Sequence, residues 1–265
     1  MRLAWLTDIH LNFLDPVQLS EFIAELAGAG VDAYLISGDI GESPSVEEFL
    51  RAMHDNLSPP IYFVLGNHDY YRASIAWVTR RITALCQEHR GLHWLSQAGT
   101  INLTTTTALL GNESWADGGY GDYQRSPVEL NDHYLIADLA GLSRPARLQQ
   151  MQNLAGRATD RIRKNLIKAF QSRRRAILVT HVPPFAEVSQ YRGRQASDEF
   201  LPFYASKILG DMLLRFMRAR PEQHLTVLCG HTHFVAQQKM LPNLEVLVGG
   251  TTYGRPEIQQ IIEIE

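Results

Sequence analysis

The sequence predicts an α/β protein built on mixed β-sheets. Over the first ninety residues, short apolar runs alternate with longer segments of helical periodicity, as in strand–helix–strand units. Later in the chain short β runs become the more frequent element, so a mixed sheet fits better than a purely doubly wound one. The 265 residues contain no internal repeat, low-complexity tract or long linker, and we expect a single domain over residues 1–265.

The N-terminal part of this pattern indicates three strands, each followed by a helix. Asp15 is a favourable N-cap for the first helix, and Pro16 suits its first position because that position needs no N–H donor. Residues 91–113 hold three short β runs joined by turns, which we expect to pair as neighbouring antiparallel strands. The expected strands are 2–7, 33–37 and 61–65, and the expected helices are 16–29, 44–55 and 73–89.

The remaining chain predicts an irregular segment and then further strands and helices. Residues 114–128 are rich in Gly, Asp and Tyr and indicate a loop, and 144–172 indicate a long polar helix. We expect 114–172 to be a loop and helix insertion near the rim of the functional site. Strands are expected at 176–181 and 225–231, a helix at 203–219, and two or three β runs in the tail.

Composition excludes several classes of protein. A formal net charge of −3 argues against the large cationic surface of a duplex DNA binder, although a nucleotide or small phosphoester remains compatible with it. The two cysteines, Cys86 and Cys229, lie far apart in the sequence and do not suggest a disulfide framework. We therefore expect a reducing compartment. No signal-peptide pattern or membrane-length apolar stretch is present, so we expect a cytoplasmic protein with no membrane partner.

Side chains that bind metals or transfer protons follow five predicted strands. In isolation each has an ordinary explanation as a turn or cap residue. Ligands bind beyond the carboxyl ends of strands in open α/β sheets, so five such ends in one chain are expected to converge. The residues are Asp8 and His10, Asp39 and Glu42, Asn67 and His68, His181, and finally His231 and His233.

The donor types indicate two divalent metal ions. Carboxylate and amide oxygens with imidazole nitrogens, and no thiolates, suit Mn²⁺, Fe, Co²⁺ or Zn²⁺. Seven such ligands exceed one tetrahedral site, so we expect two metals that share a carboxylate. The pairs Asp8/His10 and His231/His233 would each project to one side if the backbone stayed extended. Glycines before Asp39, Asn67 and His231 would let the backbone approach the site closely.

These motifs resemble those of the calcineurin-like metallophosphoesterase superfamily. The matching elements are DIH at 8–10, GDIGE at 38–42, GNHD at 66–69, a strand-ending His181, and GHTH at 230–233. The resemblance implies a four-layer α/β/β/α sandwich with two mixed β-sheets flanked by helices. It also implies a metal-dependent phosphoesterase that hydrolyses a phosphomonoester or phosphodiester, by in-line attack of a hydroxide bridging two metals.

The resemblance further implies a role for each matching residue. Asp39 would bridge the two ions, which we expect to be manganese, with Fe, Zn²⁺, Co²⁺ and Ni²⁺ as alternatives. His68 would act as a general acid, and a hydrogen bond that it donates to Glu42 would raise its pKa. One metal would be bound by Asp8, His10, Asp39 and His233, and the other by Asp39, Asn67, His181 and His231.

Three loops are candidates for substrate recognition, and two other functions stay open. The expected partner is a small phosphorylated molecule or a nucleotide. A nuclease on the same scaffold would need basic surfaces that the charge balance does not favour, and a non-catalytic binding module would be expected to have lost ligands. The loops are 112–123, with Trp115, Asp117 and Tyr120 as candidate contacts, 191–200, with Arg192 and Arg194, and 251–257.

Overall fold

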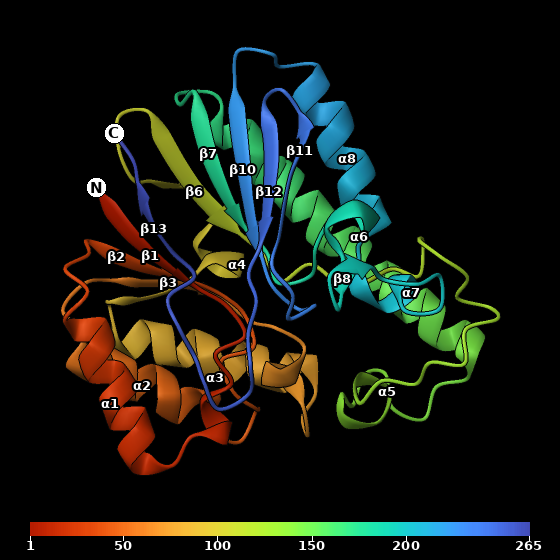
Figure 1. The fold of residues 1–265 in the computed structure, drawn as a ribbon, viewed down its shortest axis with the longest axis horizontal. Coiled ribbons are helices and arrows are strands. Elements are labelled where there is room, and N and C mark those ends of the chain that lie inside the picture. The colour runs from red at the N-terminus through yellow and green to blue at the C-terminus, as the bar shows by residue number, and fades with distance from the viewer.

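Two β-sheets lie face to face between two layers of helices in the computed structural model, which describes all 265 residues (Figure 1). The first sheet has the order β13 (Gln260–Glu263), β1 (Arg2–Leu6), β2 (Ala33–Ser37), β3 (Ile61–Val64) and β4 (Leu92–Trp94). The second has the order β11 (Ala236–Leu241), β12 (Leu244–Val248), β10 (His224–Cys229), β7 (Arg175–Val179), β6 (Thr107–Gly111) and β5 (Ile101–Asn102).

Five long helices form the two outer layers. The helices α1 (Pro16–Ala27), α2 (Val46–Asn56) and α3 (Ile75–Glu88) cover the first sheet, and α6 (Arg144–Ala169) and α8 (Lys207–Arg218) cover the second (Figure 1). The shorter elements are η1 (Leu11–Phe13), η2 (His68–Tyr70), α4 (Leu95–Ala98), α5 (Asp132–Leu135), η3 (Ala186–Val188), α7 (Leu201–Tyr204) and the hairpin of β8 (Gln190–Tyr191) and β9 (Arg194–Gln195). No helix has the length and apolar character that a bilayer crossing requires.

The layers follow from side-chain alternation along strands that are buried on both faces. In β1, Leu3 and Trp5 belong to the core between the two sheets, which also holds Ile177 and Leu228 of the second sheet. The intervening residues of β1 point the other way, into the core shared with α1, α2 and α3. Each central strand therefore contributes to two cores, and continuous apolar runs are what such strands require.

The sheets are mixed, as the sequence predicts. The pairs β1–β2, β2–β3 and β3–β4 are parallel, as are β6–β7, β7–β10 and β10–β12. The edge strands β13, β11 and β5 each run antiparallel to a neighbour. The predicted α/β/β/α sandwich is confirmed. Asp15 caps α1 as predicted, and it forms a capping box with Gln18.

Two details of the sequence prediction are wrong. The β runs of 91–113 are not one antiparallel group, because β4 pairs in parallel with β3 while β5 and β6 lie in the second sheet. Between them α4 carries the chain from one sheet to the other, with Leu95 buried in the core between the sheets. The helix expected at 203–219 is interrupted at Ala205, which is extended, so α7 and α8 are separate.

Candidate metal centre

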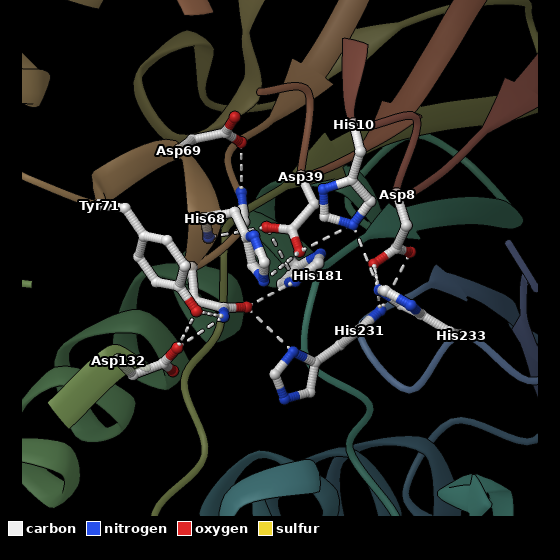
Figure 2. A network of polar contacts seen from close by, with 12 residues as sticks. Asp8, His10, Asp39, His68, Asp69, Tyr71, Asp132, His181, His231 and His233 are labelled. Atoms are coloured by element: carbon white, nitrogen blue, oxygen red, sulfur yellow. Dashed lines mark hydrogen bonds and ion pairs between the residues drawn. The ribbon is translucent and has the colours of Figure 1, made fainter. Parts of the chain in front are cut away.

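All seven predicted metal ligands converge at the carboxyl ends of five strands (Figure 2). The residues after β1, β2 and β3 approach from the first sheet, and those after β7 and β10 approach from the second. Asp8, His10, Asp39, Asn67 and His181 are buried, and His231 and His233 are half-buried. A cavity of about 270 Å³ opens above Asp39, Asn67 and the two later histidines.

The first group of donors consists of Asp8, His10, Asp39 and His233. One ligand atom from each lies within 4.8 Å of all the others. His10 Nε2 is 3.2 Å from His233 Nε2 and 3.7 Å from Asp39 Oδ2, and His233 Nε2 is 3.4 Å from Asp8 Oδ1. Two imidazole nitrogens facing two carboxylates at these distances form a compact set of four donors.

The second group of donors is centred on the side-chain oxygen of Asn67. His181 Nε2 lies 2.9 Å and His231 Nδ1 3.0 Å from Asn67 Oδ1, and His181 Nε2 is 3.4 Å from Asp39 Oδ1. The opposite ring nitrogens donate to backbone carbonyls, since His181 Nδ1 binds Ser37 O and His231 Nε2 binds Phe203 O, each at 2.9 Å. These bonds fix the ring orientations, as partners of metal-binding histidines do.

Asp39 contributes to both groups. Its Oδ1 faces His181 and its Oδ2 faces His10, so one carboxylate spans the two sets of donors. Oδ1 also accepts a hydrogen bond from the backbone N–H of His68 at 2.9 Å. This geometry is what a bridging ligand between two cations needs.

Five of the seven candidate ligands have a left-handed backbone. Asp8, His10, Asp39, His231 and His233 have φ between 40° and 72°, although each carries a side chain that disfavours this region. Their side chains therefore converge through turns after the strands end. Asp8/His10 and His231/His233 do not meet the condition of an extended backbone under which each pair would project to one side. Such conformations are costly and persist where surrounding structure enforces them, which is common at functional sites.

Three glycines allow the strand ends to meet, as the sequence predicts. A Cβ on Gly38 would lie 2.6 Å from His181 Nδ1, one on Gly66 would lie 2.1 Å from Asp39 Oδ1, and one on Gly230 would lie 1.9 Å from Asp8 Oδ2. All three distances are below van der Waals contact. Any other residue at these positions would push the ligand loops apart.

Burial and neighbouring charges shift the pKa values of the candidate ligands in different directions. Burial alone would raise the pKa of Asp8, but the hydrogen bond with His233 and the charge of His181 outweigh it and set the pKa at about 2. Burial opposes protonation of His181, yet attraction by Asp39 and Asp8 raises its pKa to about 10. Burial lowers the pKa of His10 to about 4 despite the same two carboxylates.

Metal uptake should therefore depend steeply on pH. At neutral pH His181 is protonated on both ring nitrogens, and a cation that binds Nε2 must displace a proton. We expect the apparent metal affinity to rise about tenfold per pH unit until the pH approaches 10. Calorimetry in buffers with different protonation enthalpies would count the released protons, and an affinity independent of pH would contradict this assignment.

His68 lies beside the ligands, but its predicted partner does not contact it. Glu42 Oε2 instead pairs with Arg72 Nη2 at 3.2 Å, so the predicted His68–Glu42 hydrogen bond is absent. His68 Nε2 is 3.9 Å from Asp39 Oδ2, and the ring stacks on Tyr71 with centroids 4.3 Å apart. A tyrosine ring, and not a carboxylate, fixes the orientation of this histidine.

Asp132 is a site residue that the sequence did not reveal. From the start of α5, its Oδ1 accepts hydrogen bonds from Asn67 Nδ2 at 2.8 Å and from Tyr71 Oη at 2.6 Å (Figure 2). It thereby fixes the Asn67 amide with its oxygen towards His181 and His231, and it holds the tyrosine on which His68 stacks. No spacing pattern links a carboxylate in a loop to a motif 65 residues earlier.

Replacing Asp132 should loosen the second group of donors. In Asp132→Ala the Asn67 amide keeps only its longer contact, from Nδ2 to Tyr71 Oη at 3.4 Å, and can rotate. We therefore expect about 10–100-fold weaker binding of one of two metal ions. A two-site metal titration would measure this, with Asp160→Ala, an exposed acid on α6, as the matched control. Unchanged metal affinity with reduced turnover would instead place Asp132 against the substrate.

Aromatic side chains form most of the cavity walls. Tyr71, Tyr191, Tyr204, Phe234 and Tyr253 line it together with Leu130, Asn131 and Asp132, and no lysine or arginine does. Arg192 and Arg194 are exposed on the β8–β9 hairpin, where Arg192 stacks on Tyr191. The predicted loops 191–200 and 251–257 thus reach the cavity through tyrosines and not through their arginines.

The candidate contacts in loop 112–123 lie away from this cavity. Trp115 packs on Tyr70 and lines a separate cavity of about 20 Å³ beside Asn67 and His231. Tyr120 is half-buried near Pro184, with its ring facing Lys207. The sequence analysis proposed these side chains as substrate contacts, but none of them lines the cavity above the donors.

Asp117 is a structural residue of the same loop. It is buried and accepts hydrogen bonds from the backbone N–H groups of Gly119 at 2.8 Å and Ile208, in the first turn of α8, at 2.6 Å. Asp117→Ala should lower the free energy of unfolding by about 1–2 kcal/mol, as loss of a helix cap does. Denaturant titration would measure this, and a loss of turnover without a loss of stability would instead indicate a substrate contact.

The donor set fits two divalent cations. The atoms are carboxylate and amide oxygens and imidazole nitrogens, with histidine orientations fixed from behind and close approach permitted by glycines. One ion would be held by Asp8, His10, Asp39 and His233, and the other by Asp39, Asn67, His181 and His231.

Comparisons with known proteins identify the fold and the family of this chain. The fold is similar to that of phosphopantetheinyl hydrolase from Mycobacterium tuberculosis, with a TM-score of 0.71 at 13% identity, covering 95% of this chain and 89% of that one. A dimetal phosphatase from Danio rerio is also similar, with a TM-score of 0.58 at 10% identity, covering 94% and 87%. A search of curated proteins gives no match. The calcineurin-like phosphoesterase family matches residues 1–235, and the chain belongs to that family.

Proposed function

We propose that the protein is a metal-dependent phosphoesterase that hydrolyses a small phosphomonoester or phosphodiester. The observation that carries this proposal is the pair of donor groups that share Asp39, placed at the floor of an open cavity. Manganese suits the oxygen and nitrogen donors, with Fe, Zn²⁺, Co²⁺ and Ni²⁺ as alternatives. Two bound cations would supply positive charge for the phosphoryl oxygens and acidify water at the site.

The residues around the donors suit water attack on phosphorus without a covalent enzyme intermediate. His68 is 17% exposed to the cavity and can carry a proton to the departing oxygen. Tyr71 holds the imidazole ring by stacking, and Asp132 holds Tyr71. Neither serine nor cysteine lines the cavity, which supports attack by water over attack by one of these two nucleophiles.

The cavity walls favour an ester with one phosphoryl group and a planar or apolar leaving group. Tyrosine and phenylalanine rings offer stacking surfaces, as in many small-molecule sites. Without a lysine or arginine in the walls, a diphosphate or triphosphate would gain no ion pair for its further charges. The same absence disfavours a nuclease, which needs cationic groups that follow the strand.

A substrate panel would test the proposal. The chelated enzyme would be supplied in turn with Mn²⁺, Zn²⁺ or Mg²⁺ and assayed with aryl phosphomonoesters and diesters, linear and cyclic nucleotides, a nucleoside triphosphate and single-stranded DNA. A phosphopantetheinyl ester belongs in the panel because one structural neighbour is named for that activity. We expect metal-restored hydrolysis, fastest with aryl or nucleoside esters of a single phosphate.

Three results would overturn the proposal. Hydrolysis that survives complete chelation would show that the donor groups are not the catalytic centre. Absence of metal-restored hydrolysis across the panel, in protein that binds two metal ions, would favour a binding module on this fold. Faster turnover of DNA than of any small ester would favour the nuclease.

A further inference from the structure

We propose that a second cavity, between α6 and the ends of β4 and β6, binds a small organic oxyanion. This α6 cavity has a volume of about 190 Å³ and shares no lining residue with the cavity above the metal centre. Its walls come from α3, the turn after β3, β4 with α4, the end of β6, and one face of α6. It is therefore a separate site, and the inference does not rest on the proposed phosphoesterase activity.

Three side chains of the α6 cavity offer hydrogen-bond donors that have no partner in the protein. Asn112 is 4% exposed, and its Oδ1 accepts from the N–H of Ser114 while its amide nitrogen has no partner in the protein. Arg157 and Arg161, one turn apart on α6, line the cavity and pair with no carboxylate. Two guanidinium groups and one buried amide form a site suited to a phosphate, phosphonate or carboxylate group.

The single acid in the α6 cavity is already engaged. Glu113 accepts hydrogen bonds from Trp94 Nε1 and Ser96 Oγ, each at 2.7 Å, so both of its oxygens are directed to the protein. Burial also raises the pKa of this carboxyl above its usual value, which weakens its repulsion of an anion. The cationic groups of the lining are therefore left to bind a ligand.

The remaining lining is apolar and indicates the rest of the ligand. Tyr70, Trp94 and Trp115 present aromatic surface, and Leu154 and Ala158 present aliphatic surface from α6. Ala158 follows Arg157 on α6 and also lines the cavity, where its small side chain leaves space open. A ligand with an anionic head near the arginines and an apolar body against the aromatic rings matches this arrangement.

Phenylphosphonate, an anion with an aromatic ring that is not an ester, is a suitable probe. It can also bind at the metal centre, so the metal-loaded enzyme is expected to bind two equivalents by calorimetry. Asp39→Asn should abolish phenylphosphonate binding at the metal centre and retain binding in the α6 cavity. The double variant Arg157→Gln/Arg161→Gln should bind phenylphosphonate in the α6 cavity at least tenfold more weakly. Arg163→Gln, which changes an exposed α6 arginine outside the cavity, should leave that binding unchanged.

Ala158→Leu provides a test that leaves the charges intact. The larger side chain would fill part of the α6 cavity beside the arginines, so phenylphosphonate should bind only at the metal centre. Crystals of the wild-type protein soaked in phenylphosphonate should show it between Arg157 and Trp94. Unchanged binding in both the arginine and the Ala158 variants, or density at the metal centre alone, would overturn the proposal.

Discussion

Asp39→Asn should reduce phosphoesterase turnover by about a thousandfold or more. Asp39 alone faces both donor groups, through Oδ1 to His181 and Oδ2 to His10. An amide has one oxygen and no charge, so it cannot bridge two cations, and losing one cation costs several kcal/mol of charge stabilisation in the transition state. Each 1.36 kcal/mol corresponds to about a factor of ten in rate.

The substitution conserves shape, so the protein should remain folded. An amide oxygen at Oδ1 can still accept the hydrogen bond from the His68 N–H. Metal content, measured by elemental analysis, should fall from two ions towards one, and kcat with an aryl phosphate should fall with it. Asp160→Asn on the surface of α6 is the control. Near-normal turnover in Asp39→Asn would refute the assignment of Asp39 as the bridge.

His68→Ala should keep both metals and lose about 10²–10⁴-fold in rate, the usual contribution of a general acid. His68 lies beside the ligands, not among them, with Nε2 3.9 Å from Asp39 Oδ2. The loss should be greatest for esters with poor leaving groups, because these need a proton as the bond to phosphorus breaks. A good leaving group such as nitrophenolate should be affected least.

Metal content and leaving-group dependence distinguish this role from others. Loss of a metal ion in His68→Ala would mean that the imidazole is a ligand. An equal loss of rate for all leaving groups would mean that His68 binds the phosphoryl group without transferring a proton. Glu42→Gln is an informative companion, since Glu42 pairs with Arg72 and should affect the rate far less than His68 does.

The sequence predicted the elements that local patterns determine. Apolar runs and helix caps located the strands and helices, and the residues after those runs gave all seven donors, because the carboxyl ends of parallel strands share one edge. Gly38, Gly66 and Gly230 were recognisable for the same reason, since each comes just before a donor.

Contacts between distant segments could not be predicted in this way. Asp117 looked like a substrate contact because its loop is rich in glycine, but its role depends on the position of α8, which begins 90 residues later. Asp132 depends on how an irregular loop folds back towards Asn67. Glu42 fits the motif, yet the turn after Gly41 directs it to Arg72. In each case tertiary structure, not local pattern, decides what the carboxylate contacts.

The two donor groups also connect the two sheets, because each group contains residues from both. One group takes Asp8, His10 and Asp39 from the first sheet and His233 from the second. The other takes Asp39 and Asn67 from the first and His181 and His231 from the second. Between the sheets lies only an apolar core, without a disulfide, since both cysteines are free.

Bound cations would therefore cross-link the two sheets at one end of the sandwich. Each would join segments more than a hundred residues apart and restrict the unfolded chain as a long-range cross-link does. Because cations bind the native arrangement, they would also shift the folding equilibrium towards it. The side chains that give this protein its capacity for chemistry would thus also add to the attachment between the sheets that the apolar core provides.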